Sequence, residues 1–180
     1  RLSVMASRPY SSPLRDEATA RTRERIVAAA GRLFAAQGYV ATTMAAIARE
    51  AGVSVQSVHL AGPKSTLLMA SFEVALAGDE GTHPLHERPA LAAIMTLPPD
   101  EALPAYVHFL AEANARTAGI SRALYVAAET DETIAALVAD LDERRHHDIR
   151  AGILWCIDRG MLEGDIDVDV LQVVQRRAAH

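Results

Sequence analysis

The chain has 180 residues, half of them hydrophobic, which is enough to bury a substantial core in one body or in a small domain joined to a larger one. No stretch approaches the roughly 18 consecutive apolar residues of a membrane-spanning helix, and the first residues lack the apolar centre of a signal peptide. A lone cysteine, Cys156, excludes an intrachain disulfide, and its apolar neighbours indicate a buried thiol. We therefore expect no membrane partner.

Charge is divided unequally along the chain. Residues 1–77 carry nine Arg and Lys against five Asp and Glu, a net charge of +4, whereas residues 78–180 carry nine against eighteen, a net charge of −9. A basic N-terminal part favours a polyanionic partner, and an acidic remainder discourages nonspecific adhesion to it. Surface charge that only ensures solubility is the alternative.

Residues 1–18 contain Pro and Ser and are expected to form a flexible arm. Arginines lie in or just after this segment, at Arg8, Arg15, Arg21, Arg23 and Arg25. Such an arm can follow phosphates or enter a minor groove, although a plain disordered tail is the more common outcome.

A first long helix is predicted to end at Gly38, because glycine commonly follows the last helical turn. One face of this helix carries Ile26, Ala29, Ala30, Leu33, Phe34 and Gln37.

Residues 43–64 predict two short helices joined by a glycine turn. The apolar side chains of the first recur at helical spacing, at Met44, Ile47, Ala48 and Ala51. Thr43 stands where an N-cap belongs, Gly52 can take the positive φ of a helix C-terminus, and Val53 can fill the space between the helices.

The second short helix begins at Val55 with Ser54 as its cap. Gln56, Ser57 and His59 can face outward, and such a lightly charged surface suits a major groove, where Gln can pair with adenine. The pattern is a helix-turn-helix and predicts DNA binding; an alanine-rich hairpin inside an all-α core is the alternative.

Helical periodicity continues through the rest of the chain. Leu68, Phe72, Ala75 and Leu76 mark a helix from about Pro63 to Gly78, and a connector over residues 78–99 holds a short helix at residues 89–96. Further helices are expected from Leu103 through Val107 to Gly119, from Ile120 to Ala128, and from a Thr130 cap to Gly160.

The order of long helix, hairpin and long helix resembles a known family. The residues that carry the resemblance are Arg23-Glu-Arg-Ile-Val-Ala-Ala-Ala-Gly-Arg-Leu-Phe-Ala-Ala-Gln-Gly-Tyr39, Thr42-Thr43, Ile47-Ala48 and Ala51-Gly52-Val53-Ser54. They are similar to the N-terminal domain of the tetracycline-repressor (TetR) family of bacterial transcription regulators. The resemblance implies a cytoplasmic protein with an all-α fold. In this fold a three-helix, helix-turn-helix DNA-binding domain at residues 19–79 is followed by a helical effector-binding and dimerisation bundle at residues 80–180.

The chain departs from the family after the second short helix. The usual Tyr-x-x-Phe-x-x-Lys is replaced by His59-Leu60-Ala61-Gly62-Pro63-Lys64. An imidazole N–H can replace the tyrosine hydroxyl at a phosphate, although His59 could equally be a packing residue. Lys64 is the expected phosphate contact at the next helix N-terminus. We assign DNA contacts to Thr43, Val55, Gln56, Ser57, His59 and Lys64.

An effector pocket is expected between helices of the C-terminal bundle. The large candidate lining residues are Tyr106, Phe109, Leu110, Tyr125 and Trp155, although aromatic side chains at helical spacing more often form ordinary core. We expect no metal and no cofactor: His83 and His86 lie in a linker without rigid geometry, and Asp165-x-Asp167-x-Asp169 lacks the Gly and Glu of a calcium loop.

These observations favour a transcription regulator that is not an enzyme. The leading hypothesis is a homodimeric repressor that an unidentified small-molecule effector releases from a near-palindromic, double-stranded DNA operator. Family members generally continue for one or two more helices that complete a four-helix dimer interface, whereas this chain stops at His180. We therefore expect the interface to be truncated or built from the helix around residues 131–160. The alternatives are a helical small-molecule-binding protein or enzyme with an incidental hairpin, and a protein-interaction adaptor that has lost DNA binding.

Overall fold

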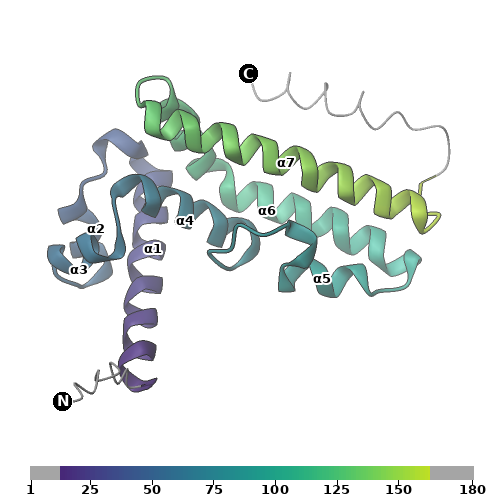
Figure 1. The fold of residues 1–180 in the computed structure, drawn as a ribbon, viewed down its shortest axis with the longest axis horizontal. Coiled ribbons are helices and arrows are strands. Elements are labelled where there is room, and N and C mark those ends of the chain that lie inside the picture. Colours follow the sequence, from purple (N-terminus) through teal and green to yellow (C-terminus); the bar gives the residue numbers. More distant parts are fainter. Residues whose placement is uncertain (1–12, 163–180) are drawn as a thin grey trace, which may run out of the picture.

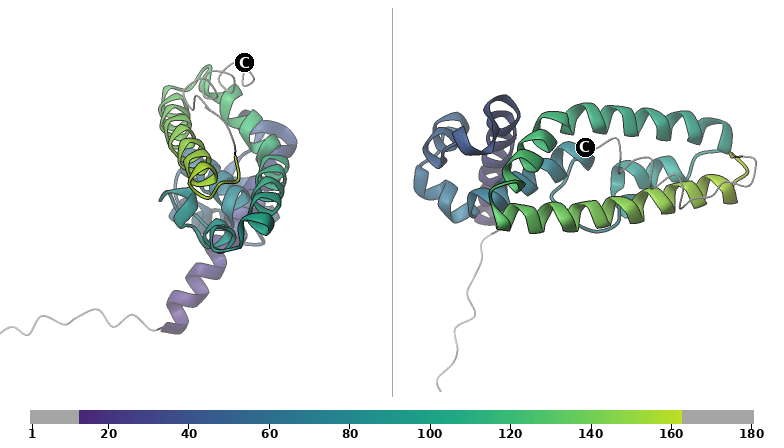
Figure 2. Two further views of the ribbon diagram at one scale, coloured as in Figure 1. Left: turned by 90° about the vertical axis from the view of Figure 1, so that its right-hand side faces the viewer. Right: turned by 90° about the horizontal axis from the view of Figure 1, so that it is seen from above.

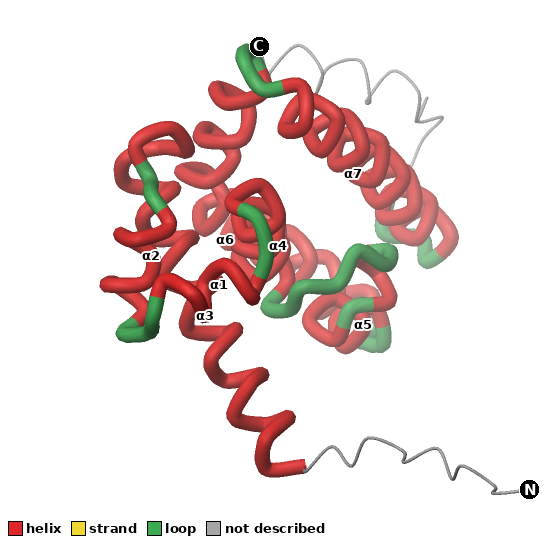
Figure 3. Tube along the Cα trace, turned by 60° about the vertical axis from the view of Figure 1, so that its left-hand side comes forward, coloured by secondary structure: helices red, strands yellow, loops and turns green. Residues whose placement is uncertain are grey.

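The computed structural model describes residues 13–162. These residues form seven α-helices and one turn of 3-10 helix, and no strand occurs among them (Figures 1 and 3). In chain order the elements are α1 (Pro13–Ala41), α2 (Met44–Ala51), α3 (Val55–Ala61), α4 (Lys64–Ala77), η1 (Leu85–Glu87), α5 (Pro89–Met95), α6 (Pro99–Ala128) and α7 (Glu132–Asp158). The all-α fold class predicted from the sequence is confirmed.

The helices form a compact group at one end and a long hairpin that extends from it. α2 and α3 lie beside α1, while α6 and α7 run antiparallel away from them (Figures 1 and 2). α4 lies between these two parts and packs against both α1 and α6, and α5 packs against α6. α1, which packs against α2, α3 and α6, and α4, which follows α3 in the chain, therefore both join the hairpin α2–α3 to the C-terminal helices.

The start of α1 differs from the expected flexible arm over residues 1–18. Residues 13–18 already form the first turns of α1, which project from the rest of the molecule (Figure 1). Proline is well tolerated in the first turn, and Asp16 there carries a charge that the helix N-terminus favours. The remainder of the arm, including Arg8, lies outside the described residues. The break predicted at Gly38 is present, because this glycine adopts φ +80° and ψ 175°.

α6 corrects two predictions. The sequence placed a helix end near Gly119, but α6 continues unbroken through this position to Ala128. Gly119 permits a close helix crossing instead, since a Cβ there would lie 2.8 Å from the Cβ of Ala35 on α1. Val107, expected on the buried face, is 57% exposed.

α7 is capped by Asp131 rather than by Thr130. The carboxylate of Asp131 accepts the N–H groups of Thr133 at 3.0 Å and Ile134 at 3.2 Å, which satisfies two N–H groups that the helix leaves free. Near its other end Cys156 is 3% exposed, as the sequence predicted, and burial raises the pKa of its thiol.

The larger of two hydrophobic clusters in the described residues runs through both halves of the molecule. Phe34 of α1 and Ile47 of α2 belong to the same buried cluster as Leu124 of α6 and Leu141 of α7. The division into domains at residues 19–79 and 80–180 stays a prediction, but the halves share this core.

The following observations concern membrane spans, metal-binding groups and the C-terminal segment. None of the described helices has the length and apolarity to span a membrane. No three His, Cys, Asp or Glu side chains in the same range are grouped so that they could hold a metal ion. The Asp165–Asp169 sequence and the rest of residues 163–180 lie outside the described residues.

Candidate nucleic-acid interface and effector cavity

The hairpin α2–α3 is fixed by side-chain caps at both helix starts. Thr43 Oγ1 accepts the N–H of Ala46 at 3.1 Å, and Ser54 Oγ accepts the N–H of Ser57 at 3.1 Å. Between the helices Gly52 adopts φ +65° and ψ 40°, a conformation that strains residues with a Cβ. Both predicted caps and the glycine turn are confirmed, and they set the angle between α2 and α3.

One face of α3 is anchored and the opposite face is open. Val58 is fully buried, whereas Val55 is 42% exposed and Gln56 and His59 are exposed. Ser57 is half-buried, and its hydroxyl pairs with the capping serine at 2.9 Å. Within the described residues, the side chains of Gln56 and His59 have no protein partner. Their polar atoms are therefore available to a nucleic acid.

Lys64, the only lysine of the chain, has a structural role that the sequence did not indicate. Its Nζ donates to the carbonyls of Tyr39 at 3.0 Å and Thr42 at 3.1 Å, and lies 4.1 Å from the centroid of the Tyr39 ring. Burial lowers the pKa of Lys64, and the charge of Asp131 opposes this effect. An ammonium carries three N–H bonds, so one remains for a phosphate. The phosphate contact at Lys64 stays a prediction.

Two arginines near the predicted arm orient the hairpin. Arg23 donates to the carboxylate of Glu80 at 2.6 Å and to the carbonyl of Ala61, the last residue of α3, at 2.6 Å. Arg25 donates to the carbonyl of Ala51, the last residue of α2, at 2.6 Å. Each guanidinium thus meets the negative end of a short helix, where cations are favoured.

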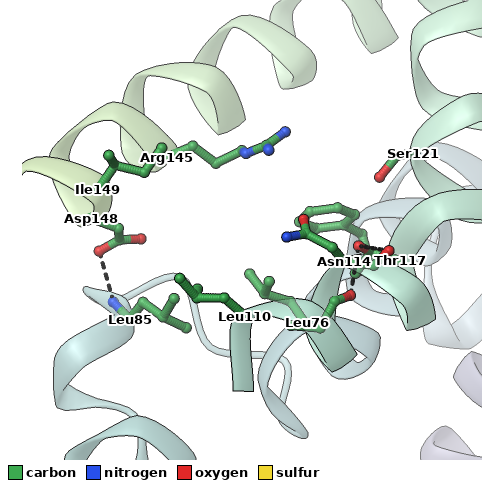
Figure 4. A pocket seen from close by; sticks show the side chains of 11 residues that line it. Leu76, Leu85, Leu110, Asn114, Thr117, Ser121, Arg145, Asp148 and Ile149 are labelled. Carbon is green, nitrogen blue, oxygen red and sulfur yellow. Dashed lines mark hydrogen bonds between the residues drawn. The ribbon is translucent and has the colours of Figure 1, made fainter. Parts of the chain in front are cut away.

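A cavity of about 130 Å³, partly open to solvent, lies between α4, α6, α7 and η1 (Figure 4). This volume is below the roughly 300–1,000 Å³ of sites for drug-sized ligands, so the cavity favours a small ligand. It is lined by Phe72, Leu76, Leu85, Leu110, Ala113, Asn114, Thr117, Ser121, Arg145, Asp148 and Ile149.

The polar groups of the cavity lie on two sides. Arg145 extends from α7 into the cavity on the side of Asn114 and Ser121 (Figure 4). On another side, Asp148 accepts the N–H of Leu85 at 2.9 Å. Burial raises the pKa of Asp148, although this hydrogen bond and nearby positive charges oppose the shift.

Of the five side chains predicted for the pocket, Leu110 alone lines this cavity. Phe109 is buried in a second apolar cluster, and Tyr106 packs edge-on against Trp155 with ring centroids 5.7 Å apart. Burial raises the pKa of Tyr106 to about 12. Tyr125 donates its hydroxyl hydrogen to the carboxylate of Asp142 on α7 at 2.7 Å. These aromatic side chains serve packing and helix contacts, while the cavity is lined mainly by smaller residues.

Beside the cavity, a buried ion network joins α4, α7 and the start of α5. Glu73 receives hydrogen bonds from Arg88 at 2.6 Å and Arg144 at 2.8 Å, and the side chains of Glu73 and Arg88 are each 2% exposed. Arg88 also pairs with Asp79 at 2.6 Å, and Arg144 with Asp140 at 3.1 Å. Burial alone would lower the pKa of Arg144. The hydrogen bond and the negative charge of Glu73 outweigh this effect and raise the pKa of Arg144. Sequence reasoning missed this network, although Glu73 is the sole charged residue in residues 65–77.

Comparison with known families matches residues 26–61 to the family described as bacterial regulatory proteins, tetR family. The matched range covers most of α1 and all of α2 and α3, which carry the capped hairpin. No curated protein and no solved structure matches the chain.

Proposed function

Because residues 26–61 match the tetR family of bacterial regulatory proteins, we propose that the chain is a DNA-binding transcription regulator. In its specific form the proposal is a homodimeric repressor that a small-molecule effector releases from DNA. The observation that carries the DNA-binding part is the open face of α3, where Gln56 and His59 stand free on a helix fixed by the Ser54 cap.

Gln56 is the proposed base-reading residue. It lies in the first turn of α3, and the N-terminal residues of a recognition helix are those that reach base edges in the major groove. Its amide can bond to adenine through two atoms, while His59 and the third N–H of Lys64 would bind phosphates. Thr43 and Val55, both exposed at helix starts, would complete the contact.

α4 is the proposed connection between effector and DNA. Its first residue, Lys64, holds the turn between α1 and α2, and Phe72 and Leu76 further along the same helix line the cavity. A ligand that fits the cavity better in one position of α4 would favour one position of α3. The ligand would relieve repression if the position of α3 that it favours binds DNA more weakly.

Dimerisation would place two copies of α3 in successive major grooves about 34 Å apart, which requires a near-palindromic operator. Selection of bound sequences from random DNA tests both parts, and recovery of a palindrome with this spacing is the expected result. Recovery of no preferred sequence would refute the proposal, and a persistent monomer in light scattering at micromolar concentration would refute the dimer.

Two variants test the proposed contacts. Gln56→Ala should relax the preference at one base pair by about 1–3 kcal/mol, whereas Lys64→Ala should weaken binding to every sequence and lower the salt slope by about 1. Arg122→Ala removes one positive charge from an exposed position on α6 and is the matched control, which should leave both quantities unchanged. Unaltered DNA binding by both test variants would exclude this docking of α3. A ligand that lowers operator affinity supports the repressor, whereas a ligand that is chemically converted supports the enzyme alternative.

A further inference from the structure

We propose that the cavity between α4, α6 and α7 binds an amphipathic monoanion, a carboxylate joined to a hydrocarbon body, with the carboxylate at Arg145. This inference rests on the proposed function in one respect, because it takes the same cavity to be the effector site.

The positive charge of Arg145 is unpaired within the described residues. Its one hydrogen bond runs from Nη1 to Tyr125 Oη at 3.5 Å, and the guanidinium has no ion pair. The adjacent Arg144 pairs with two carboxylates, as does Arg88. A half-buried guanidinium that lines a cavity without a carboxylate partner can bind a carboxylate ligand through two parallel hydrogen bonds.

Two neutral polar groups lie on the same side of the cavity as the guanidinium. Asn114 and Ser121 are seven residues apart on α6, which places them on one face of the helix, and Figure 4 shows both beside the cavity. Neither side chain has a hydrogen-bond partner within residues 13–162. They can therefore donate to a carboxylate oxygen without giving up an existing bond.

The remaining lining selects what is attached to the carboxylate. Phe72, Leu76, Leu110 and Ile149 present apolar surface, which favours a hydrocarbon body. Asp148 lies near Leu85, away from the side where Arg145 meets Asn114 (Figure 4). A carboxylate there disfavours a second negative charge on the ligand, so a monoanion is preferred to a dianion.

Three probes that differ only in the head group test the proposal: octanoate, octanol and octylamine. Calorimetric titration of the full-length protein should show octanoate binding at least tenfold more tightly than octanol, and octylamine more weakly still. Arg145→Met removes the charge but keeps the apolar stem, so it should lose at least tenfold in octanoate affinity and change octanol affinity less than threefold. Arg150→Met, at an exposed position of the same helix that does not line the cavity, is the matched control and should bind octanoate as the wild type does.

Equal affinities for octanoate and octanol, tightest binding of octylamine, or an unaffected Arg145→Met variant would each overturn the proposal. So would the absence of octanoate binding at about 1 mM, the weak limit of small-molecule affinity. Should Arg145→Met fail to fold by circular dichroism, Asn114→Leu takes its place and should selectively lower octanoate affinity. The octanoate titrations contain no DNA. A failure of the protein to bind an operator would therefore refute the proposed function and leave the ligand proposal untouched. Octanoate that binds without changing operator affinity would refute the effector role and leave the ligand class standing.

Discussion

Replacing Glu73 by Gln would leave two arginines facing a neutral amide inside the protein. Arg88 would lose its buried carboxylate partner at 2.6 Å, and Arg144 would lose the one at 2.8 Å. Because Glu73 and Arg88 are each 2% exposed, water cannot compensate for the lost charge. Breaking such a buried pair from one side lowers stability by about 3–5 kcal/mol, a large share of the 5–15 kcal/mol that is typical of a domain.

Asp140→Asn is the matched control, because Asp140 pairs with the same Arg144 at 3.1 Å but is 68% exposed. Exposed pairs contribute about 1 kcal/mol or less, so this variant should unfold close to the wild type. Urea unfolding followed by circular dichroism gives both free energies by linear extrapolation. If Glu73→Gln lost no more stability than Asp140→Asn, the buried network would not stabilise the fold as described. The double variant Glu73→Leu/Arg88→Met removes both buried charges and should recover part of the loss.

Three further substitutions test other contacts. Gly119→Ala should lower stability by about 1–3 kcal/mol, because the new Cβ would lie 2.8 Å from Ala35 Cβ and 3.1 Å from its Cα on α1. Ala35→Gly in the same chain removes only the first of these contacts and should recover part of the loss; no recovery in thermal unfolding would count against the close crossing. Lys64→Met should lower the free energy of unfolding by about 1–3 kcal/mol because two charged hydrogen bonds to backbone carbonyls are lost, and an unchanged urea midpoint would contradict this. Tyr106→Phe should reduce the loss of stability above pH 10. The pKa of Tyr106 is about 12 in the folded protein and near 10 when unfolded, so the folded state holds a proton that the unfolded state has released, and wild-type stability falls as pH rises through this window. Identical alkaline unfolding curves for wild type and variant would contradict it.

The hairpin could be predicted in detail because its signals are local. Thr43 and Ser54 each cap a helix within three residues, and Gly52 takes its positive φ from the turn itself. Such features depend on neighbouring residues alone, so the sequence contains them completely.

The cavity could not be predicted in the same way, because it depends on how distant helices meet. Gly119 looked like a helix end, since the sequence does not reveal that Ala35 of α1 passes beside it. Aromatic size suggested Trp155 and Tyr106 as pocket residues, but they pack against each other. Glu73 could have been noticed in the sequence, because it is an isolated charge in an apolar helix. A charge of this kind predicts a buried partner of opposite charge but does not identify it.

The close crossing of α1 and α6 limits which C-terminal helices can be joined to residues 13–79 in a chimera. A chimera that joined residues 13–79 to the C-terminal helices of another protein would place a foreign helix against Ala35. Unless that helix also offered a glycine at the crossing, the two backbones would be forced apart and the shared core would open. Residues 13–79 and the C-terminal helices should therefore be exchanged together in any chimera that is to keep its shared core.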